Sequence, residues 1–294
     1  LKNTYLDPLP SYIIPDTQRV HSSFNQTMTA TGRLSTSSPN FQNIPIRTED
    51  GKEIRKAIKA QSNEFQIFSA DYSQVELRVM AHLSGDESLI SALNNGEDIH
   101  TFTAKNIFNI DNDDMVLPEM RRIAKIVNFG IMYGAGPFRL SQELDIPFGE
   151  AKQIKDAYFK KYQGIEKYIE NSKLQIKETK SVATLLGRKR AVWDSDSQNK
   201  IRRDAAERMA INMPIQGTAA EMIKLAMIKI HRQMNKENLK SKLIMQIHDE
   251  LLLEVHQDEI DYISKMVIEH MRNAMKLDVP IEIDFGLGPS WYEA

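Results

Sequence analysis

The sequence contains a short apolar run, Phe65-Gln66-Ile67-Phe68-Ser69-Ala70, which ends at Asp71. A run of this length predicts a buried strand, and the mixed helical spacing of apolar residues over 75–83 predicts a helix directly after it. Asp71 is therefore expected at a strand-to-helix junction. A charged side chain there is unfavourable unless it lies at the edge of a sheet or meets a cation.

A second aspartate, Asp249, occupies a similar position near the other end of the chain. It lies between two strand-like runs, 243–247 and 251–255, which predict a hairpin with acidic residues at its turn. If the strands that carry Asp71 and Asp249 are neighbours, the two carboxylates would hold two Mg²⁺ ions about 3.5–4 Å apart, as in phosphoryl transfer. The alternative is that Asp71 caps a helix and Asp249 belongs to a polar turn.

The pattern of the remaining chain predicts an α+β fold with a helical insertion. Residues 86–180 have mostly helical spacing, interrupted at glycines and prolines, whereas strand-like runs lie towards both ends of the chain. Pro214 is expected to interrupt helix between Asn212 and Gln216. The other expected elements are loops and short extended pieces over 17–45, a hairpin over 182–192, helices over 217–234 and 258–275, and a strand near 280–285.

Length and composition exclude several classes of protein. The 294 residues suggest one large domain or two ordinary ones, and the absence of cysteine excludes disulfides, thiolate metal sites and a cysteine nucleophile. No apolar run approaches the ~20 residues needed to span a bilayer, so we expect no membrane partner and a cytoplasmic location. The sequence has no Gly-x-x-x-x-Gly-Lys loop and no dinucleotide-binding glycine pattern, which argues against ordinary ATPases and dehydrogenases.

Charge is segregated along the chain. Residues 61–120 contain 2 basic and 11 acidic residues, whereas residues 121–208 contain 19 basic and 11 acidic residues. A basic middle beside acidic stretches is suited to a protein that holds a polyanion on one surface and gathers carboxylates around cations on another. Solvated helix faces explain the same counts equally well.

Four residues of the basic middle form one helical stripe. Arg121, Lys125, Phe129 and Tyr133 recur at every fourth position, so two cations are followed by two aromatic rings on one face. A nucleoside triphosphate along this helix would place its phosphates on the cations and its base and sugar against the rings. The alternative is an amphipathic helix with a solvated basic end and an aromatic end in the core.

Two amide side chains, Asn212 and Gln216, follow a group of arginines that includes Arg208. Amides beside arginine are suited to the acceptors of the DNA minor groove, which are present whatever the base sequence. A polar loop is the alternative.

The order of these motifs closely resembles that of the polymerase domain of family A DNA polymerases, the bacterial DNA polymerase I type. Several motifs in the same order are far more specific than any one of them, so the resemblance favours the functional interpretation of each. The matching stretches, which extend over essentially the whole chain, are Thr29-Ala30-Thr31-Gly32-Arg33-Leu34-Ser35, Asp71-Tyr72-Ser73-Gln74-Val75-Glu76-Leu77-Arg78, Arg121 through Gly134, Gln216-Gly217-Thr218-Ala219-Ala220 and His248-Asp249-Glu250.

The resemblance implies a right-hand polymerase fold, in which a palm made of an antiparallel sheet with backing helices carries helical fingers. The palm would comprise residues 1–83, with a remnant of the thumb at 1–15, together with residues 201–294, and the fingers would comprise residues 84–200. Most of the thumb and the upstream exonuclease domains of the family would be missing. We therefore expect a fragment or truncated enzyme with a weak hold on duplex DNA, low processivity and no proofreading.

The resemblance also implies a role for individual residues. Asp71 and Asp249 would bind two Mg²⁺ ions, or Mn²⁺ in their place, with the main-chain carbonyl of Tyr72 as a further ligand. Glu76 would pack against Tyr133 to exclude a 2′-hydroxyl, and Phe129 would confer discrimination against dideoxynucleotides. The implied catalytic residues are Asp71, Asp249, Glu250 and Lys125. The implied dNTP-binding residues are His100, Arg121, Lys125, Phe129, Tyr133, Glu76 and Gln74. The implied DNA-binding residues are Arg33, Arg208, Asn212, Gln216 and His248.

The implied activity is template-directed addition of dNMP from a dNTP to the 3′-hydroxyl of a primer by a monomeric enzyme. Two other hypotheses remain. In the first, the chain binds primer–template DNA or nucleotide with negligible turnover. In the second, it is a single-subunit RNA polymerase, which shares the two acids and the stripe. Glu76 together with Phe129 favours DNA synthesis.

Overall fold

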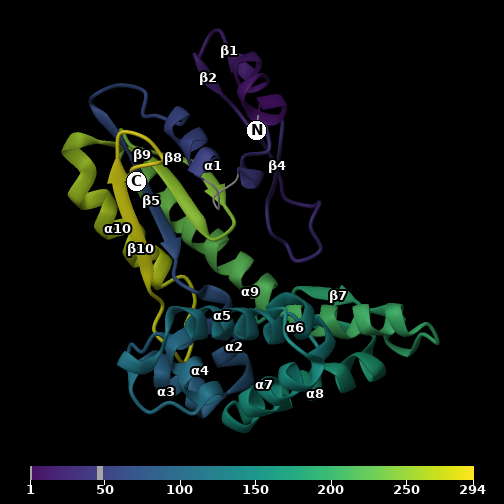
Figure 1. Cartoon of the computed structure of the whole chain (residues 1–294). Coiled ribbons are helices and arrows are strands. Elements are labelled where there is room, and N and C mark those ends of the chain that lie inside the picture. The colour runs from purple at the N-terminus through teal and green to yellow at the C-terminus, as the bar shows by residue number, and fades with distance from the viewer. Residues whose placement is uncertain (1, 45–48) are drawn as a thin grey trace. The chain divides into compact units, whose positions relative to one another are not determined.

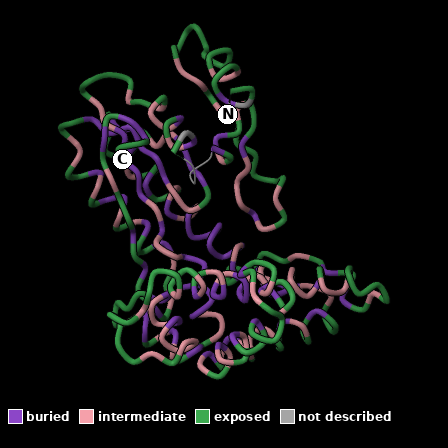
Figure 2. Tube along the Cα trace, viewed as in Figure 1, coloured by how far each residue is buried: buried purple, intermediate pink, exposed green. Residues whose placement is uncertain are grey.

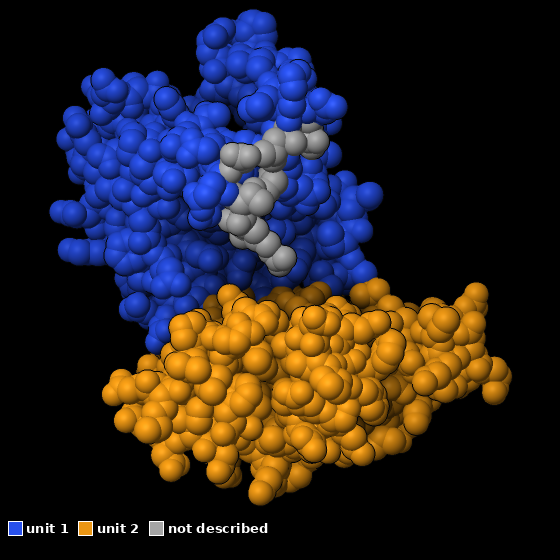
Figure 3. Space-filling model, in the orientation of Figure 1, with its two compact units in different colours: residues 1–73, 219–276, 281–294 blue, residues 74–218, 277–280 orange. Residues whose placement is uncertain are grey.

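The computed structural model describes residues 2–44 and 49–294, which divide into two compact units (Figure 3). Unit 1 extends to residue 73 and also includes residues 219–276 and 281–294, whereas unit 2 comprises residues 74–218 and 277–280. The unit boundaries thus lie at 73/74 and 218/219, and the domain boundaries expected from the sequence lie at 83/84 and 200/201. The first boundary differs because the helix that follows Asp71 packs within unit 2.

Unit 1 contains a four-stranded antiparallel sheet with strand order β10-β5-β9-β8 (Figure 1). It is built from both ends of the chain, and its strands are β5 (Phe65–Tyr72), β8 (Lys242–Ile247), β9 (Glu250–His256) and β10 (Ile283–Gly288). The strands and helices of this unit combine into an α+β fold. Most residues of β5 and β9 are buried (Figure 2), as a central pair of strands covered on both faces requires.

The alternation of side chains along β5 assigns its two faces. Ser69 and Asp71 lie on one face, and Ala70 and Tyr72 lie on the other. Tyr72 Oη donates a hydrogen bond of 2.8 Å to the main-chain oxygen of Met271 on α10 (Ile260–Arg272). Helix α10 therefore covers the face opposite Asp71.

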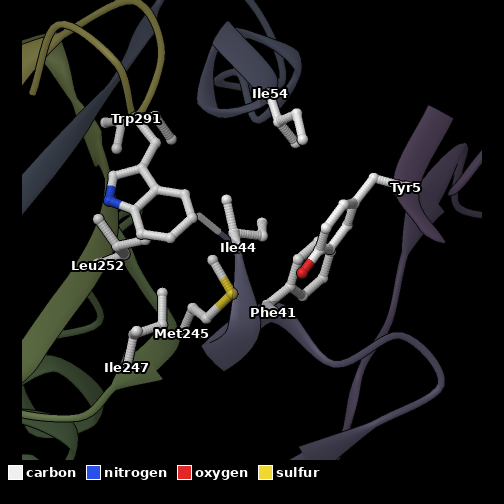
Figure 4. Close-up of a cluster of buried hydrophobic side chains, with 9 residues drawn as sticks. Tyr5, Phe41, Ile44, Ile54, Met245, Ile247, Leu252 and Trp291 are labelled. Carbon is white, nitrogen blue, oxygen red and sulfur yellow. The ribbon is translucent and has the colours of Figure 1, made fainter. Parts of the chain in front are cut away.

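The face of the sheet that carries Asp71 is covered at one end by a hydrophobic cluster (Figure 4). The sheet contributes Ile67, Met245, Ile247 and Leu252, and the C-terminal segment contributes Trp291, which is 1% exposed. The remaining buried members come from the N-terminal segment and are Tyr5, Phe41, Ile44 and Ile54. Burial of these side chains attaches the first part of the chain to the sheet.

The N-terminal part of unit 1 has only short elements, as expected for loops and extended pieces. Its two antiparallel pairs are β1–β2 and β3–β4. The short elements include β1 (Ile13–Ile14), β2 (Arg19–Val20), β3 (Ser23–Asn25), β4 (Ser35–Ser37), α1 (Glu49–Glu53) and the 3₁₀ turn η4 (Ile54–Ala57).

Unit 2 is helical. Some of its helices pack against the next helix in the chain, as α4 does on α5, and others against a helix distant in the sequence, as α2 does on α8. The expected hairpin around Gly187 is confirmed as β6 (Ser181–Ala183) paired with β7 (Lys189–Ala191). The helices are α2 (Val75–Ser84), α3 (Glu87–Asn94), α4 (Ile99–Phe108), α5 (Pro118–Met132), α6 (Pro137–Leu144), α7 (Phe148–Lys161), α8 (Gln163–Thr179) and the first part of α9 (Lys200–Lys236), up to residue 218.

The expected interruption at Pro214 is wrong. Helix α9 (Lys200–Lys236) is one 37-residue helix with Pro214 inside it. Proline removes one main-chain hydrogen bond from a helix, but Met213 and Ile215 on either side of it are at most 1% exposed. Packing of this buried segment outweighs the local cost, as tertiary contacts commonly do.

Two expected strand positions are also corrected. Strand β5 continues to Tyr72, so Asp71 lies within the strand and not after it. Strand β10 begins at Ile283, whereas the sequence suggested a strand near 280–285. Of the described helices, none combines the length and the apolar character needed to cross a bilayer.

Candidate active site

Three carboxylates lie in one row across the sheet of unit 1. Asp71 on β5 pairs with Glu250 on β9 and with Asp284 on β10. Side chains of paired residues lie on the same face, with Cβ atoms about 4.5–5.5 Å apart. Asp249 precedes Glu250, and its main-chain oxygen accepts a hydrogen bond of 3.2 Å from the Tyr72 N–H. The structure thus brings Asp71, Asp249 and Glu250 together from distant parts of the sequence.

A tight turn places Asp249 at the edge of this row. Strand β8 ends at Ile247 and β9 begins at Glu250, so only His248 and Asp249 lie between them. His248 adopts a left-handed conformation with φ of 54°, and its main-chain oxygen accepts a hydrogen bond from the side-chain amide of Gln246. A two-residue turn with positive φ matches the twist of the paired strands. His248 itself is exposed.

The Asp71 carboxyl is held in an environment that disfavours its negative charge. Burial raises its pKa from 3.8 to about 8, and the neighbouring charges of Asp249, Glu250 and Asp284 add to the increase. Its Oδ1 atom is buried and has no hydrogen-bond partner among residues 2–44 and 49–294. A cation would relieve both the repulsion between the acids and the unpaired oxygen.

This raised pKa predicts a pH-dependent stability in the absence of divalent cations. The unfolded chain releases the Asp71 proton near pH 3.8, whereas the folded chain retains it until about pH 8. The contribution of Asp71 protonation to the free energy of unfolding is fully present below pH 3.8 and is lost as the pH rises towards 8. In EDTA, the melting temperature of Asp71→Asn relative to that of the parent should therefore rise between pH 5 and pH 8.5. A gain of several degrees is expected, because about 1 kcal/mol corresponds to about 2–4 °C at this size. An equal difference in melting temperature between Asp71→Asn and the parent at pH 5 and at pH 8.5 would contradict the assignment.

A cavity of about 750 Å³ opens beside the three acids. Asp71, Asp249, Glu250 and Asp284 line it together with the guanidinium-bearing side chain of Arg55. Burial lowers the pKa of Arg55, and the charges of Glu250 and Asp71 act in the opposite direction. The cavity therefore combines concentrated negative charge with the basic side chain of Arg55.

The donors at this cavity suit a hard divalent cation. Carboxylate and main-chain carbonyl oxygens are the ligands that Mg²⁺ prefers, and Mg²⁺ usually takes one or two carboxylates and keeps several waters. In the described part of the chain, no group of three or more His, Asp or Glu side chains is arranged around a common point as a complete metal cage. Asp71, Asp249 and the Tyr72 carbonyl fit the more open kind of site.

The predicted stripe of cations and rings runs along α5 of unit 2, with Tyr133 directly after the last residue of the helix. Arg121 and Lys125 are exposed, and Phe129 and Tyr133 are half-buried. The rings of Phe129 and Tyr133 are stacked, with centroids 6.3 Å apart and an interplanar angle of 27°. The helix ends at this point because Gly134 takes a φ of 75°, in the left-handed region that glycine adopts without strain. The stripe thus offers a charged half and an aromatic half to the same ligand.

In this structure the first cation of the stripe is paired. Arg121 donates two hydrogen bonds, of 3.1 and 2.7 Å, to the carboxylate of Asp98, which also caps α4 through the Thr101 N–H. Although burial acts to raise the pKa of Asp98, the hydrogen bonds from Arg121 and Thr101 outweigh it and lower the value to about 2. A phosphate that binds Arg121 would share or displace this carboxylate.

His100 lies next to the stripe but carries no charge at neutral pH. Its side chain is 3% exposed and its ring centroid lies 5.8 Å from that of Phe129. Burial lowers its pKa to about 4, assisted by the charges of Arg121 and Lys125. The Asn128 amide donates to Nδ1, which leaves Nε2 to carry the proton. His100 is thus suited to contact a phosphate only as a neutral donor.

Glu76 and Tyr133 are in contact, as the resemblance implied. Tyr133 Oη donates a hydrogen bond of 2.6 Å to Glu76 Oε2, and Glu76 is 7% exposed at the start of α2. Gln74, which precedes the helix, has a φ of 52°, and this left-handed conformation is uncommon for residues other than glycine. Strained backbone of this kind is found often at ligand sites.

Three of the expected DNA-binding residues lie along α9. Arg208, Asn212 and Gln216 are four residues apart and partly exposed, so they share one face of the helix. The Asn212 amide donates to the Tyr133 main-chain oxygen at 3.4 Å, whereas its Oδ1 is buried without a partner among the described residues. The other two, Arg33 and His248, belong to unit 1, where Arg33 is half-buried.

Sequence patterns did not mark several residues that line the cavity, among them Asp284, Arg55 and Trp291. Asp284 lies in a strand whose position was misjudged, and a correct register for 283–288 would have paired it with Asp71. Arg55 and Trp291 lie in a turn and near the C-terminus, where no periodicity marks them. A signal that could have found Trp291 is the aromatic pair Trp291-Tyr292 in the short terminal segment.

Comparison with known proteins identifies relatives over the full length of the chain. A family model described as "DNA polymerase family A" matches residues 1–293. The DNA polymerase I of Bacillus subtilis (strain 168) is 47% identical over all 294 residues, which are 33% of that protein. A thermostable DNA polymerase I of Thermus filiformis is 49% identical over the same residues, which are 35% of its length.

A solved structure also matches. It is described as the POL domain of Pol1 from M. smegmatis in complex with DNA primer-template and dNTP. The match has a TM-score of 0.94 and 44% sequence identity, and it covers 98% of this chain and 51% of that one. The chain spans about a third of the length of the curated relatives described above.

Proposed function

We propose, since the chain belongs to DNA polymerase family A, that it extends a primer strand by template-directed transfer of dNMP from dNTP. The observation that carries the proposal is the buried, unpaired Oδ1 of Asp71 in a row of carboxylates at the cavity of unit 1. Repulsion between these acids makes the site costly to maintain unless a cation binds there. In the palm-and-fingers description, unit 1 would be the palm and unit 2 the fingers.

Asp71, Asp249 and the carbonyl of Tyr72 would hold the divalent cations. Bound Mg²⁺ would make the primer 3′-hydroxyl more acidic and would neutralise charge on the leaving pyrophosphate. Glu250, paired with Asp71 across the strands, would lie beside these ligands. Each carboxylate must be ionised when the cation binds, so metal affinity should rise with pH until Asp71 has lost its proton.

The stripe on α5 would bind the dNTP. Lys125 and Arg121 would hold the triphosphate, with His100 as a neutral donor, and the stacked Phe129 and Tyr133 rings would lie against the base and sugar. Glu76, fixed by the Tyr133 hydroxyl, would occupy the space that a ribose 2′-hydroxyl requires. This contact favours DNA synthesis over RNA synthesis, and Gln74 at the start of α2 would complete the pocket.

The DNA would be held by side chains that do not distinguish base sequence. Arg208, Asn212 and Gln216 on α9 would face the minor groove, whose acceptors are common to all base pairs. Arg33 and His248 would contact the primer end. We assign proofreading to none of these residues.

Primer extension tests the proposal directly. The purified chain, mixed with a primer–template duplex, Mg²⁺ and four dNTPs, should lengthen the primer in a template-dependent way. It should incorporate NTPs far less well, which an RNA polymerase would not do. A mobility shift of the duplex without longer products, at any enzyme concentration, would show a binding protein and would refute the proposed activity.

A further inference from the structure

One carboxylate oxygen of Glu250 is held by two donors from different parts of unit 1. Glu250 Oε1 accepts a hydrogen bond of 2.6 Å from Ser69 Oγ and one of 2.7 Å from Trp291 Nε1. We propose that Trp291 and Ser69 are positioning residues that fix the Glu250 carboxylate so that it supports the divalent cation at Asp71 and Asp249. This inference rests on the proposed function, and it assigns a role to the C-terminal segment and to β5.

The indole is itself firmly held. Trp291 is 1% exposed and packs among the hydrophobic side chains of the sheet and the N-terminal segment. Figure 4 shows its ring beside Leu252, with the indole nitrogen on the side away from Ile54 and Tyr5. The guanidinium carbon of Arg55 lies 3.9 Å from the ring centroid, a close cation–π contact. A donor fixed in this way constrains the orientation of its acceptor.

The serine donor comes from the same face of the sheet as the acids. Ser69 lies two residues before Asp71 on β5, and Asp71 pairs with Glu250 on β9. Ser69, Asp71 and Glu250 therefore project to one side of the sheet. The two donors occupy Oε1, whereas Oε2 accepts no hydrogen bond from the described residues. Oε2 is the oxygen that remains for a cation or for water bound to it.

The choice of acceptor argues for a role beyond packing. A buried indole N–H needs one acceptor, and a main-chain carbonyl would serve without bringing a charge near three other acids. Here it donates to a carboxylate beside Asp71, whose own charge is already disfavoured by its neighbours. Loss of a hydrogen bond that orients a group around a metal typically costs about 10–100-fold in metal affinity.

The test is a titration of the purified chain with Mn²⁺, in which free Mn²⁺ is followed by electron paramagnetic resonance without DNA or nucleotide. Trp291→Phe keeps an aromatic side chain but removes the N–H donor and part of the ring volume, whereas Ser69→Ala removes the second donor at little cost in volume. Each should weaken Mn²⁺ binding roughly tenfold. In a Glu250→Gln background the same substitutions should change the Mn²⁺ affinity by less than about twofold, since the negative charge that they orient is gone.

Different outcomes separate this inference from the proposed function. If the parent binds no Mn²⁺, or binds it equally well after Asp71→Asn, both the metal site and the positioning role are overturned. If Asp71→Asn abolishes binding while Trp291→Phe and Ser69→Ala bind Mn²⁺ as the parent does, only the positioning role fails. An equal loss in the parent and Glu250→Gln backgrounds also overturns it. Melting curves identify a misfolded Trp291→Phe, in which case Ser69→Ala decides.

Discussion

Asp71→Asn and Asp249→Asn are each expected to lower the rate of primer extension by at least about 10³-fold. Asparagine keeps the size of the side chain and one oxygen but removes the negative charge that binds a divalent cation. Loss of either acid would leave the site with too little negative charge to bind the cation, because the structure brings few oxygen ligands together there. Single-turnover extension in Mg²⁺ measures the effect without interference from product release.

The matched control is Asp258→Asn. Asp258 is an exposed acid of the same unit, 3.7 Å from Lys240 and outside the residues that line the cavity, so its loss removes the same charge from a different place. Its extension rate should stay within about twofold of the parent. Both site variants should still shift a primer–template duplex, since they lack none of the proposed DNA contacts. Near-normal Mg²⁺-dependent synthesis by either site variant would remove that residue from the metal site.

Glu76→Ala should reduce the preference for dNTP over NTP by a factor on the order of 10². The buried Glu76 side chain is fixed by the Tyr133 hydroxyl at 2.6 Å, so it cannot readily move away from a ribose 2′-hydroxyl. Alanine vacates that space, and the NTP then loses its steric penalty while the dNTP gains nothing. The ratio of kcat/KM for dCTP and CTP opposite a template guanine measures the change.

Glu76→Gln is the matched control for this prediction. Glutamine has nearly the same volume as glutamate and also accepts a hydrogen bond from Tyr133, so it should retain most of the discrimination. If alanine and glutamine give equal losses, the charge of Glu76 matters and its bulk does not. If neither changes the ratio, Glu76 has no part in sugar selection.

The acids and the stripe were predictable from the sequence because both depend on local periodicity. The run Phe65–Ala70 marks a buried strand whatever lies beside it, and the four-residue spacing from Arg121 to Tyr133 fixes one face of a helix. The contact between Asp71 and Asp249 was a hypothesis about strand neighbours. Only the order of the motifs turned this hypothesis into a prediction. The structure pairs β5 with β9.

What escaped prediction depends on register and on contacts between distant segments. Asp284 joins the acidic row only through the register of β10 on β5, and a shift of one residue would move it to the other face. The hydrogen bond from Trp291 to Glu250 links residues 41 positions apart through the packing of the C-terminal segment. Pro214 was misjudged because burial of Met213 and Ile215 stabilises a helix that local preference alone disfavours.

Anomalous diffraction from crystals of the chain grown with MnCl₂ tests the central claim most directly. We expect a Mn²⁺ peak at the cavity of unit 1, with oxygens of both Asp71 and Asp249 about 2 Å from the ion. The Asp71→Asn variant, crystallised in the same way, should lose the peak. Ordered Mn²⁺ elsewhere in the molecule, with none bridging these two aspartates, would contradict it.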